Sequence, residues 1–589
     1  MLLTIWATME LPRGLRADEP RKADLILLGD SILTMEAAQP RVEALAVSAG
    51  RILALGKRTD IMALRGDSTR IVHLKDRTLL PGFVDAHTHP VLSAMMGETA
   101  DISGFKHDSR AAVIKTIRAA VAKAGKGDWV LAYGWDPAIV ADLKAPTLKE
   151  LDEIAPDNPL LIIAQTLHSS FANSRAFKAA GVTRDTPQPK GGYFEKDARG
   201  NLTGTVVEVG AMAYFRKATP KFPRAAYVYL LTNQMEAYAR AGYTTITAPG
   251  LQPLIPEHLR SMRETAEHPD SPVNVSVYPL PKFVKGDSLE RMKRGRNAKG
   301  PYRVLGPKLW IDGSPYAGGM AMREPYLNTP LTRAALGIKP GSRGHLHHNT
   351  KELNAAVLRW HRLGAQISAH VQGERAAAQF LDAVEIALRK FPRKDHRHRM
   401  EHNALVTPAQ FQRAAQLGVT VSFYIDHVYY YGDALRESIV GPDRAARFMA
   451  MNAAKQAGHR VSLHTDSPSS PLGVFRAMTT AITRKTRSGK YTLGSEQGVS
   501  RLDALKAVTI HAAWQIFQEK DRGSLAPGKI ADFTLVSRDP LQTPAKDWRT
   551  IRVLETWRAG QKMEYGGWTW RKISLVLQVV WGRFTGWFS

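Results

Sequence analysis

The spacing of hydrophobic positions divides the chain into a long middle segment and two flanks. Over residues 79–520, short apolar runs alternate with stretches whose hydrophobic residues recur at helical spacing. This alternation predicts a parallel sheet or barrel whose strands are connected by helices. The apolar runs expected to be strands are 129–133, 160–164, 244–247, 273–277, 308–311, 365–369, 419–422 and 461–463. The stretches expected to be helices are 111–124, 225–241, 351–363, 374–390 and 501–517.

The two flanks are rich in short strands. Apolar runs at 24–28, 44–47 and 51–55 are separated by turn-forming residues at Gly29-Asp30 and Ala49-Gly50. A similar β-rich stretch returns after the middle segment, from Gly523 onward. We therefore expect both chain ends to build one small β-sandwich domain.

These patterns predict five segments. We expect a leader or signal-like remnant at 1–22, β-sandwich parts at 23–80 and 523–566, a barrel at 81–522 with an inserted lid or subdomain at about 100–240, and a tail at 567–589.

The terminal segments leave localisation open. Residues 1–9 are apolar without a positive lead, so they are either an ordinary leader or the remnant of a signal peptide ending near Ala17. The tail interleaves Trp, Phe and aliphatic residues with Arg571, Lys572 and Arg583. Such a cationic amphipathic segment can lie in a membrane interface as a peripheral contact, or pack on its own domain or on a homo-oligomer partner. We expect a cytoplasmic protein, with a periplasmic or peripheral membrane location as the alternative.

The charge and the cysteine count restrict the chemistry. There are 81 Lys and Arg against 54 Asp and Glu, a net charge of +27, but the basic residues are scattered and their densest cluster is only 393–399. Because no nucleic-acid-binding motif accompanies them, we interpret the charge as a solvated surface and expect no nucleic-acid partner. The absence of cysteine excludes disulfides, thiolate metal sites and cysteine nucleophiles. Any metal must therefore be held by histidine and carboxylate.

One segment carries the clearest chemical signal. An apolar run from Leu79 ends in His87-Thr88-His89. On a β-strand, residues i and i+2 point to the same side, so both imidazoles can bind one metal ion from the strand's end. The alternative is an ordinary histidine pair beside a turn.

Four further ionisable residues stand at predicted strand ends. They are Lys308, His370, His402 and Asp466. Singly, each has an ordinary explanation: a surface lysine, a strand-end histidine or a turn carboxylate. Because all four follow the histidine pair in order, and because strand carboxyl ends build the active site of α/β barrels, a shared site is the better interpretation.

The chain resembles the amidohydrolase superfamily, and within it most closely amidohydrolase family 3. The resemblance covers about 23–565 and is carried by several pieces. These are 81–89, Gly134-Trp135-Asp136, His168 with 173–176, 203–208, Lys308 with Asp312-Gly313-Ser314, His370 with Gly373, Glu401-His402, Asp466-Ser467-Pro468 and 525–532. The resemblance implies an α/β fold, a TIM-like (β/α)₈ barrel of a metal-dependent hydrolase.

The resemblance also implies the ligands. Metal ligation falls to His87, His89, His370, His402 and Asp466. A carbamylated Lys308 would bridge two divalent ions, and Glu208 is the competing bridge. Zinc is the expected metal, one or two per chain, with manganese or iron also compatible with such ligands. The sequence departs from the family pattern in the aromatic run 423–431 and at Gly373-Glu374.

The expected activity is metal-assisted hydrolysis of a non-peptide C–N bond, of the N-acyl or N-formyl type, in a small molecule. Asp466 would act as general base and then acid, and His168 and His427 are candidates for holding the carbonyl or oxyanion. A structural role is the alternative for His168. The same site could also serve a cyclic imide, lactone or ester hydrolase or a deaminase, and a non-catalytic regulatory protein with a vestigial site is a further alternative.

Overall fold

The computed structural model describes residues 22–221, 223–251, 257–567 and 569–581. Two runs of parallel strands lie at its centre. The first has the order β15 (Tyr302–Val304), β14 (Asn274–Pro279), β13 (Tyr243–Leu251), β6 (Phe83–Asp85). The second runs through β16 (Lys308–Trp310), β17 (Ser368–Val371), β18 (Arg399–His402), β19 (Thr420–Phe423) and β20 (Ser462–Leu463). The predicted leader, 1–22, lies almost entirely outside the described residues.

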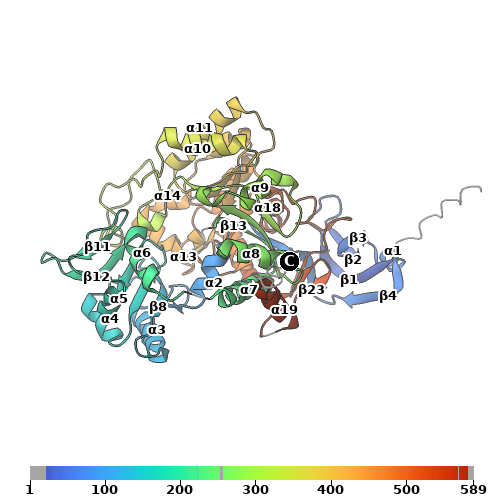
Figure 1. Cartoon of the computed structure of the whole chain (residues 1–589). Coiled ribbons are helices and arrows are strands. Elements are labelled where there is room, and N and C mark those ends of the chain that lie inside the picture. Colours follow the sequence, from blue (N-terminus) through green and yellow to red (C-terminus); the bar gives the residue numbers. More distant parts are fainter. Residues whose placement is uncertain (1–21, 222, 252–256, 568, 582–589) are drawn as a thin grey trace, which may run out of the picture.

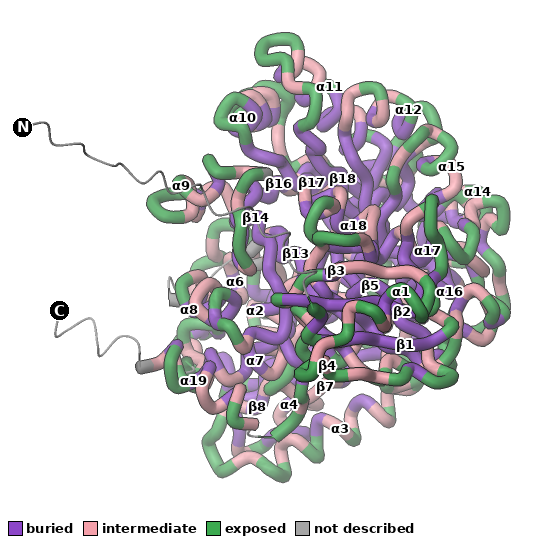
Figure 2. Tube along the Cα trace, turned by 90° about the vertical axis from the view of Figure 1, so that its right-hand side faces the viewer, coloured by how far each residue is buried: buried purple, intermediate pink, exposed green. Residues whose placement is uncertain are grey.

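The two runs form one ring, joined at one seam by the chain itself and at the other by a backbone hydrogen bond. Leu305 donates to Val277 on one side of the Gly306-Pro307 step, and Ser368 donates to Pro307 on the other. At the opposite seam, Asp466 donates to His87 at 2.9 Å. Because the strands are parallel, their carboxyl ends share one edge of the ring, where an α/β barrel carries its active site. Figure 2 shows these strands as a buried centre surrounded by more exposed helices.

Four of the expected helical stretches form as the sequence predicts: α3 (Arg110–Lys123), α7 (Arg224–Arg240), α10 (Thr350–Arg362) and α11 (Glu374–Lys390). Of these, α3 packs on a separate sheet and not on the ring. The single helix expected at 501–517 is wrong. It is split into α17 (Arg501–Ala507) and α18 (Ile510–Gln515). The interruption has a tertiary cause, since the carbonyl of Val508 accepts a hydrogen bond from Val84 on β6.

Strands from both chain ends form a separate eight-stranded sheet, at the right of Figure 1. Its order is β23 (Gln561–Lys562), β22 (Val553–Arg558), β21 (Phe533–Val536), β5 (Thr78–Pro81), β1 (Ala23–Leu33), β2 (Arg41–Ser48), β3 (Arg51–Gly56), with β4 (Arg65–His73) also on β1. The turn predicted at Gly29-Asp30 is wrong, because the chain passes it as a bulge inside β1. The joining of both ends is thus observed, while the sandwich form stays a prediction.

A six-stranded sheet occupies the lower left of Figure 1. It has the order β11 (Tyr193–Lys196), β12 (Leu202–Val207), β10 (Ser169–Ala172), β9 (Leu160–Ala164), β8 (Val130–Trp135), β7 (Ala100–Asp101). The runs 129–133 and 160–164, which the alternation pattern groups with the barrel strands, belong to this sheet. The spacing of hydrophobic residues alone could not separate them from barrel strands, because both kinds of strand are short and apolar.

The C-terminal helix α19 (Trp570–Trp581) packs on α7 and on α8 (Glu257–Glu267). Leu575, Val576 and Val579 are buried, and Lys572 forms a buried ion pair with Glu236 of α7 at 3.0 Å. Trp570 remains 84% exposed. The described part of the tail therefore packs on its own domain with its apolar stripe. Across the described residues, no helix has both the length and the apolarity needed to span a bilayer.

Candidate metal centre

His87, His89 and Asp466 converge at the seam between β6 and β20. Nε2 of His89 lies 3.0 Å from Oδ1 of Asp466, and Nε2 of His87 lies 3.5 Å from the same oxygen. Yet this buried oxygen has no hydrogen-bond partner among the described residues. Three donor atoms that approach one another without bonding are the arrangement expected of ligands that share a cation.

The ring of His87 is oriented from behind by a carboxylate. Its Nδ1 lies 3.1 Å from Oε2 of Glu401, which is fully buried on β18. Burial alone would raise the pKa of Glu401, but Arg399 and Lys308 outweigh it and hold the pKa below its usual value. Glu401 is therefore ionised and accepts the Nδ1 proton of His87. This leaves the lone pair on Nε2 facing Asp466, as in carboxylate–histidine–metal arrangements.

His370 is held in the same way. Its Nδ1 lies 3.2 Å from Oδ1 of Asp312, whose two oxygens also accept hydrogen bonds from the backbone of Gln372, Gly373 and Ala321. Held by these donors, Asp312 orients the His370 ring. Nε2 of His370 is then free to act as a ligand.

His402 completes the histidine group. Its ring centroid lies 4.8 Å from that of His87 and 4.6 Å from that of His370. Nδ1 of His402 lies 3.2 Å from Nε2 of His464, and Nδ1 of His464 lies 2.6 Å from the hydroxyl of Ser422. His87, His402 and His464 can bring one nitrogen each within 4.8 Å of one another.

Burial keeps these imidazoles uncharged. It lowers the pKa of His87 and of His402 well below the usual value, and it lowers the pKa of His464 to about 3. A neutral imidazole has a lone pair to offer, which a protonated one lacks. These imidazoles are therefore already in the neutral form that can bind a cation.

Lys308 lies beneath this group on β16. It is fully buried, its Nζ has no hydrogen-bond partner among the described residues, and burial lowers its pKa to about 8. Glu401 and Asp466 act in the opposite direction. An isolated buried ammonium is costly, so this amine is poised to lose its charge.

The backbone is strained at two of these positions. His402 has φ of +75° and Asp466 has φ of +52°, values that side chains other than glycine rarely adopt. Such strain costs roughly 1–3 kcal/mol per residue and tends to persist at functional sites. At both residues it occurs where a strand ends and a ligand atom must turn into the ring.

The six-stranded sheet closes over this edge. Gln165, just after β9, donates to the carbonyl of Pro468 at 3.1 Å and to the hydroxyl of Tyr133 on β8 at 2.8 Å. His168 and Glu208 lie at the same end of that sheet and pair at 3.1 Å. Neither is among the residues that converge as possible ligands. Glu208 lies against His168 in the covering sheet, and its bridging role stays a prediction.

His427 enters the site from α13 (Asp426–Ala434), directly after β19. Its Nδ1 contacts the hydroxyl of Tyr316 at 2.5 Å, and its buried Nε2 has no hydrogen-bond partner among the described residues. Burial lowers the pKa of His427 to about 3, while Asp466 acts in the opposite direction. A buried ring nitrogen without a partner is available for a hydrogen bond to a substrate.

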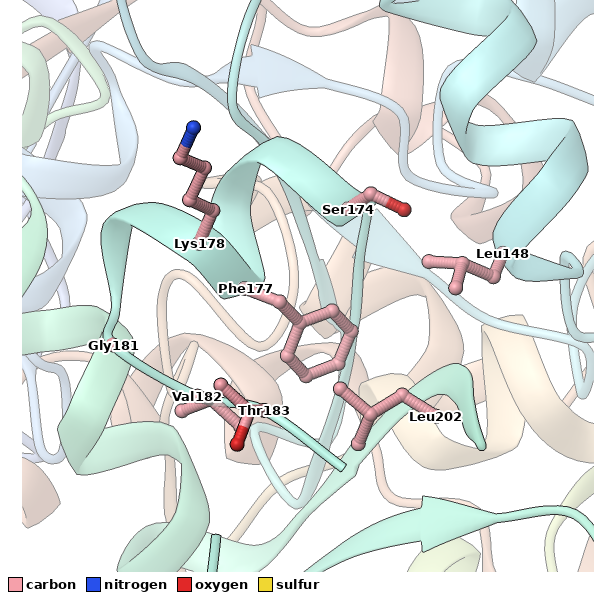
Figure 3. Close-up of a pocket in the computed structure, with 8 residues that line it drawn as sticks. All are labelled: Leu148, Ser174, Phe177, Lys178, Gly181, Val182, Thr183 and Leu202. Carbon is pink, nitrogen blue, oxygen red and sulfur yellow. The ribbon is translucent and has the colours of Figure 1, made fainter. Parts of the chain in front are cut away.

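A surface hollow of about 320 Å³ is lined by other residues than these. Figure 3 shows Phe177 between Leu148 and Leu202, with Lys178 on the same helix. Neither a histidine nor a carboxylate lines it. We therefore assign the chemistry to the ring edge and not to this hollow.

Sequence reasoning missed three parts of the site. Glu401 was noted only beside His402, Asp312 only within a motif, and His464 was not singled out. A signal for His464 was present, because His464 and Asp466 stand two apart at a strand end, as do His87 and His89. No comparable local signal marks Glu401, whose contact to His87 spans 314 residues.

Comparison with known proteins agrees with this geometry. The model of the Amidohydrolase family matches residues 70–563. The N-substituted formamide deformylase of Arthrobacter pascens is 26% identical, over 91% of this chain and 97% of that protein. Protein LONG AFTER FAR-RED 3 of Arabidopsis thaliana is also 26% identical, over 92% and 91%. The crystal structure of an uncharacterized metal-dependent hydrolase from Pyrococcus horikoshii superposes with a TM-score of 0.69 at 25% identity, covering 89% of this chain and 99% of that one.

Proposed function

The chain belongs to the amidohydrolase family and is a hydrolase of C–N bonds, and from that premise we propose that it cleaves the amide of an N-formyl or N-acyl small molecule. The observation that carries the proposal is the approach of Nε2 of His89 and Nε2 of His87 to the unpartnered Oδ1 of Asp466. The Arthrobacter relative is named for N-substituted formamides, so N-formyl amines are the first substrates to test.

The donor set fits a divalent cation. His87, His89 and Asp466 would hold one ion, and His370 and His402 would hold a second, with Lys308 between them if it is carbamylated. A cation bound there would lower the pKa of water towards about 7 and polarise the substrate carbonyl. Zinc is the expected ion, since histidine and carboxylate oxygen are its usual ligands where cysteine is absent.

The residues of the chain then divide the proton transfers. Asp466 takes the proton of the attacking water and delivers it to the leaving nitrogen, so the amine departs neutral. His427 donates its Nε2 proton as a hydrogen bond to the carbonyl oxygen, where negative charge develops. Glu401 and Asp312 hold the His87 and His370 rings in place while this happens.

The decisive experiment combines metal content with a substrate panel. We expect plasma mass spectrometry, on protein purified without chelators or an affinity metal, to find one to two equivalents of divalent metal per chain. The panel contains N-formyl, N-acetyl and N-benzoyl derivatives of small amines, a matched ester, a lactone and an aminopurine. Turnover of at least one amide is expected, with loss after chelation and recovery with zinc or manganese.

Two outcomes would contradict the proposal. Turnover confined to the lactone, ester or aminopurine would keep the metal site but change the bond that is cleaved. Protein without metal, and without recovery on addition of zinc or manganese, would favour the non-catalytic alternative.

Lys308→Met tests the bridge. We expect metal content to fall by about one equivalent, because the buried amine, with its pKa lowered to about 8, can react with carbon dioxide and supply an anionic oxygen between two cations. Carbon-13 NMR of protein grown with labelled bicarbonate should show a carbamate that Lys308→Met lacks. Lys455→Met, which removes a surface lysine paired with Asp503, is the matched control. Unchanged metal content with no carbamate signal would exclude the bridge.

A further inference from the structure

Among the described residues, the hydroxyl of Tyr316 is the one hydrogen-bond partner of the His427 imidazole nitrogens. The O···Nδ1 distance is 2.5 Å, and both side chains are buried. Burial raises the pKa of Tyr316 well above its usual value, so the phenol keeps its proton and can donate it. The pair joins residues 111 positions apart.

The direction of this hydrogen bond determines which nitrogen of His427 carries the proton. If Nδ1–H donated to Tyr316, the buried phenol proton would have no other acceptor among the described residues, at a cost of roughly 1–3 kcal/mol. If the phenol donates to Nδ1, its proton is satisfied and the imidazole proton resides on Nε2. In the second arrangement, the one group of this pair that still lacks a partner among the described residues is the Nε2–H donor of His427.

Tyr316 is itself held in place by Tyr431, which is in turn hydrogen-bonded to Asp136. Its ring stacks on that of Tyr431 with centroids 3.9 Å apart and an interplanar angle of 16°. The hydroxyl of Tyr431 donates to Oδ2 of Asp136 at 2.8 Å. Asp136 follows β8 in the six-stranded sheet and is buried, and its Oδ1 accepts from the backbone of Ala138. A continuous set of contacts therefore runs from the covering sheet to His427.

We propose that Tyr316 is a positioning residue that fixes His427 in the tautomer protonated on Nε2, so that this N–H faces the reacting carbonyl. The proposal rests on the proposed function for the role of the N–H, but the tautomer itself does not depend on any substrate. Tyr431 and Asp136 keep the Tyr316 ring in the place that this requires.

Tyr316→Phe should separate kcat from KM. The substitution keeps the ring that stacks on Tyr431 and removes only the donor to Nδ1. With the amide substrate found in the panel, kcat is expected to fall about 10- to 100-fold while KM changes by less than about threefold, because the N–H of His427 is most needed where charge develops. Tyr429→Phe is the matched control. Tyr429 lies on α13, the helix of His427, but it is partly exposed, and its hydroxyl accepts a hydrogen bond from Arg549 at the surface.

A double-mutant cycle tests whether Tyr316 acts through His427. Glutamine can present an N–H near the position of Nε2 but has no atom that takes the place of Nδ1. In a His427→Gln background, Tyr316→Phe should therefore change kcat by less than about twofold. Equal fold-losses in both backgrounds would overturn the proposal.

Nitrogen-15 NMR of histidine-labelled, zinc-loaded protein provides a readout independent of turnover. The His427 signals, assigned by their loss in His427→Gln, should show an unprotonated Nδ1 and a protonated Nε2 in the wild type. Tyr316→Phe should introduce a population protonated on Nδ1. A wild-type His427 protonated on Nδ1, or spectra identical in both proteins, would overturn the proposal. If the tautomer is as expected and no amide is turned over, it is the proposed function that fails.

Discussion

Asp466→Asn should abolish nearly all amide turnover, lowering kcat by about 10³-fold or more. The substitution keeps the shape of the side chain but removes the group that accepts the proton of water and returns it to the leaving nitrogen. General acid–base catalysis contributes roughly 10²- to 10⁴-fold, and here one residue has both roles. The strained backbone at this residue, with φ of +52°, tolerates Asn better than most other residues, so the fold should be retained.

The measurement is steady-state turnover alongside metal content and thermal unfolding. Asp503→Asn, a surface carboxylate paired with Lys455, controls for the loss of one negative charge. Asp466→Glu should recover only part of the activity, because an additional methylene displaces the carboxylate from its place between His87 and His89. An Asp466→Asn protein that keeps its metal and more than about a tenth of its activity would show that another group moves the proton.

The free energy of unfolding should fall steeply as the pH drops below about 6.5. Buried histidines with lowered pKa values cause this. Besides those of the candidate metal centre, they include a group of three at the opposite end of β18 from His402: His361, His396 and His398. Nε2 of His398 contacts Nδ1 of His361 at 2.9 Å, and Nδ1 of His398 accepts from the backbone of Ile367 at 3.0 Å. Each ring is neutral in this network, and a further proton on His398 would break one of its bonds.

The pKa values determine the direction in which stability changes with pH. Burial lowers the pKa of His396 to about 4 and that of His398 well below the usual 6.5, and it also lowers that of His361. Below pH 6.5 the unfolded chain binds protons that the folded protein does not, so stability is present above that pH and is lost as pH falls. A group whose folded pKa lies well below the pH contributes about 1.4 kcal/mol per pH unit over this range.

Urea unfolding between pH 7.5 and 5 checks this. His398→Asn should be less stable at neutral pH but should show a shallower dependence on pH than the wild type, because one proton-linked group is gone. His73→Asn, at an exposed position on β4, should leave the slope unchanged. A slope that His398→Asn does not alter would exclude the network as a cause.

Local pattern predicted the residues at the ends of single strands. His87 and His89 follow an apolar run, and His370, His402 and Asp466 lie at or just beyond the carboxyl end of a strand, so their positions could be read from local spacing, while the resemblance to a known family supplied the shared ligand role. Tyr316 and Glu401 could not be found in this way. Their contacts to His427 and His87 depend on which strands become neighbours and on how loops fold across the ring, and neither is encoded in local spacing.

The wrong predictions about the fold have the same origin as the missed site residues. The helix expected over 501–517 is interrupted because Val508 meets Val84 of the first barrel strand, over 400 residues earlier in the chain. The runs 129–133 and 160–164 resemble barrel strands in sequence because they are short and apolar, whereas their partners are in the covering sheet. In both cases tertiary contacts overrode a correct local preference.

The sheet made from both chain ends has a consequence for how the protein is made. β5 pairs with β21, so the edge of β5 has no partner until some 450 further residues have been synthesised. At about 5–20 residues per second, that interval is roughly 20–90 s. During it the nascent chain carries an open, apolar strand edge, which is a site for wrong pairing with other chains. A chain that ends before residue 533 lacks β21, so this edge of β5 would stay open and the sheet would be incomplete.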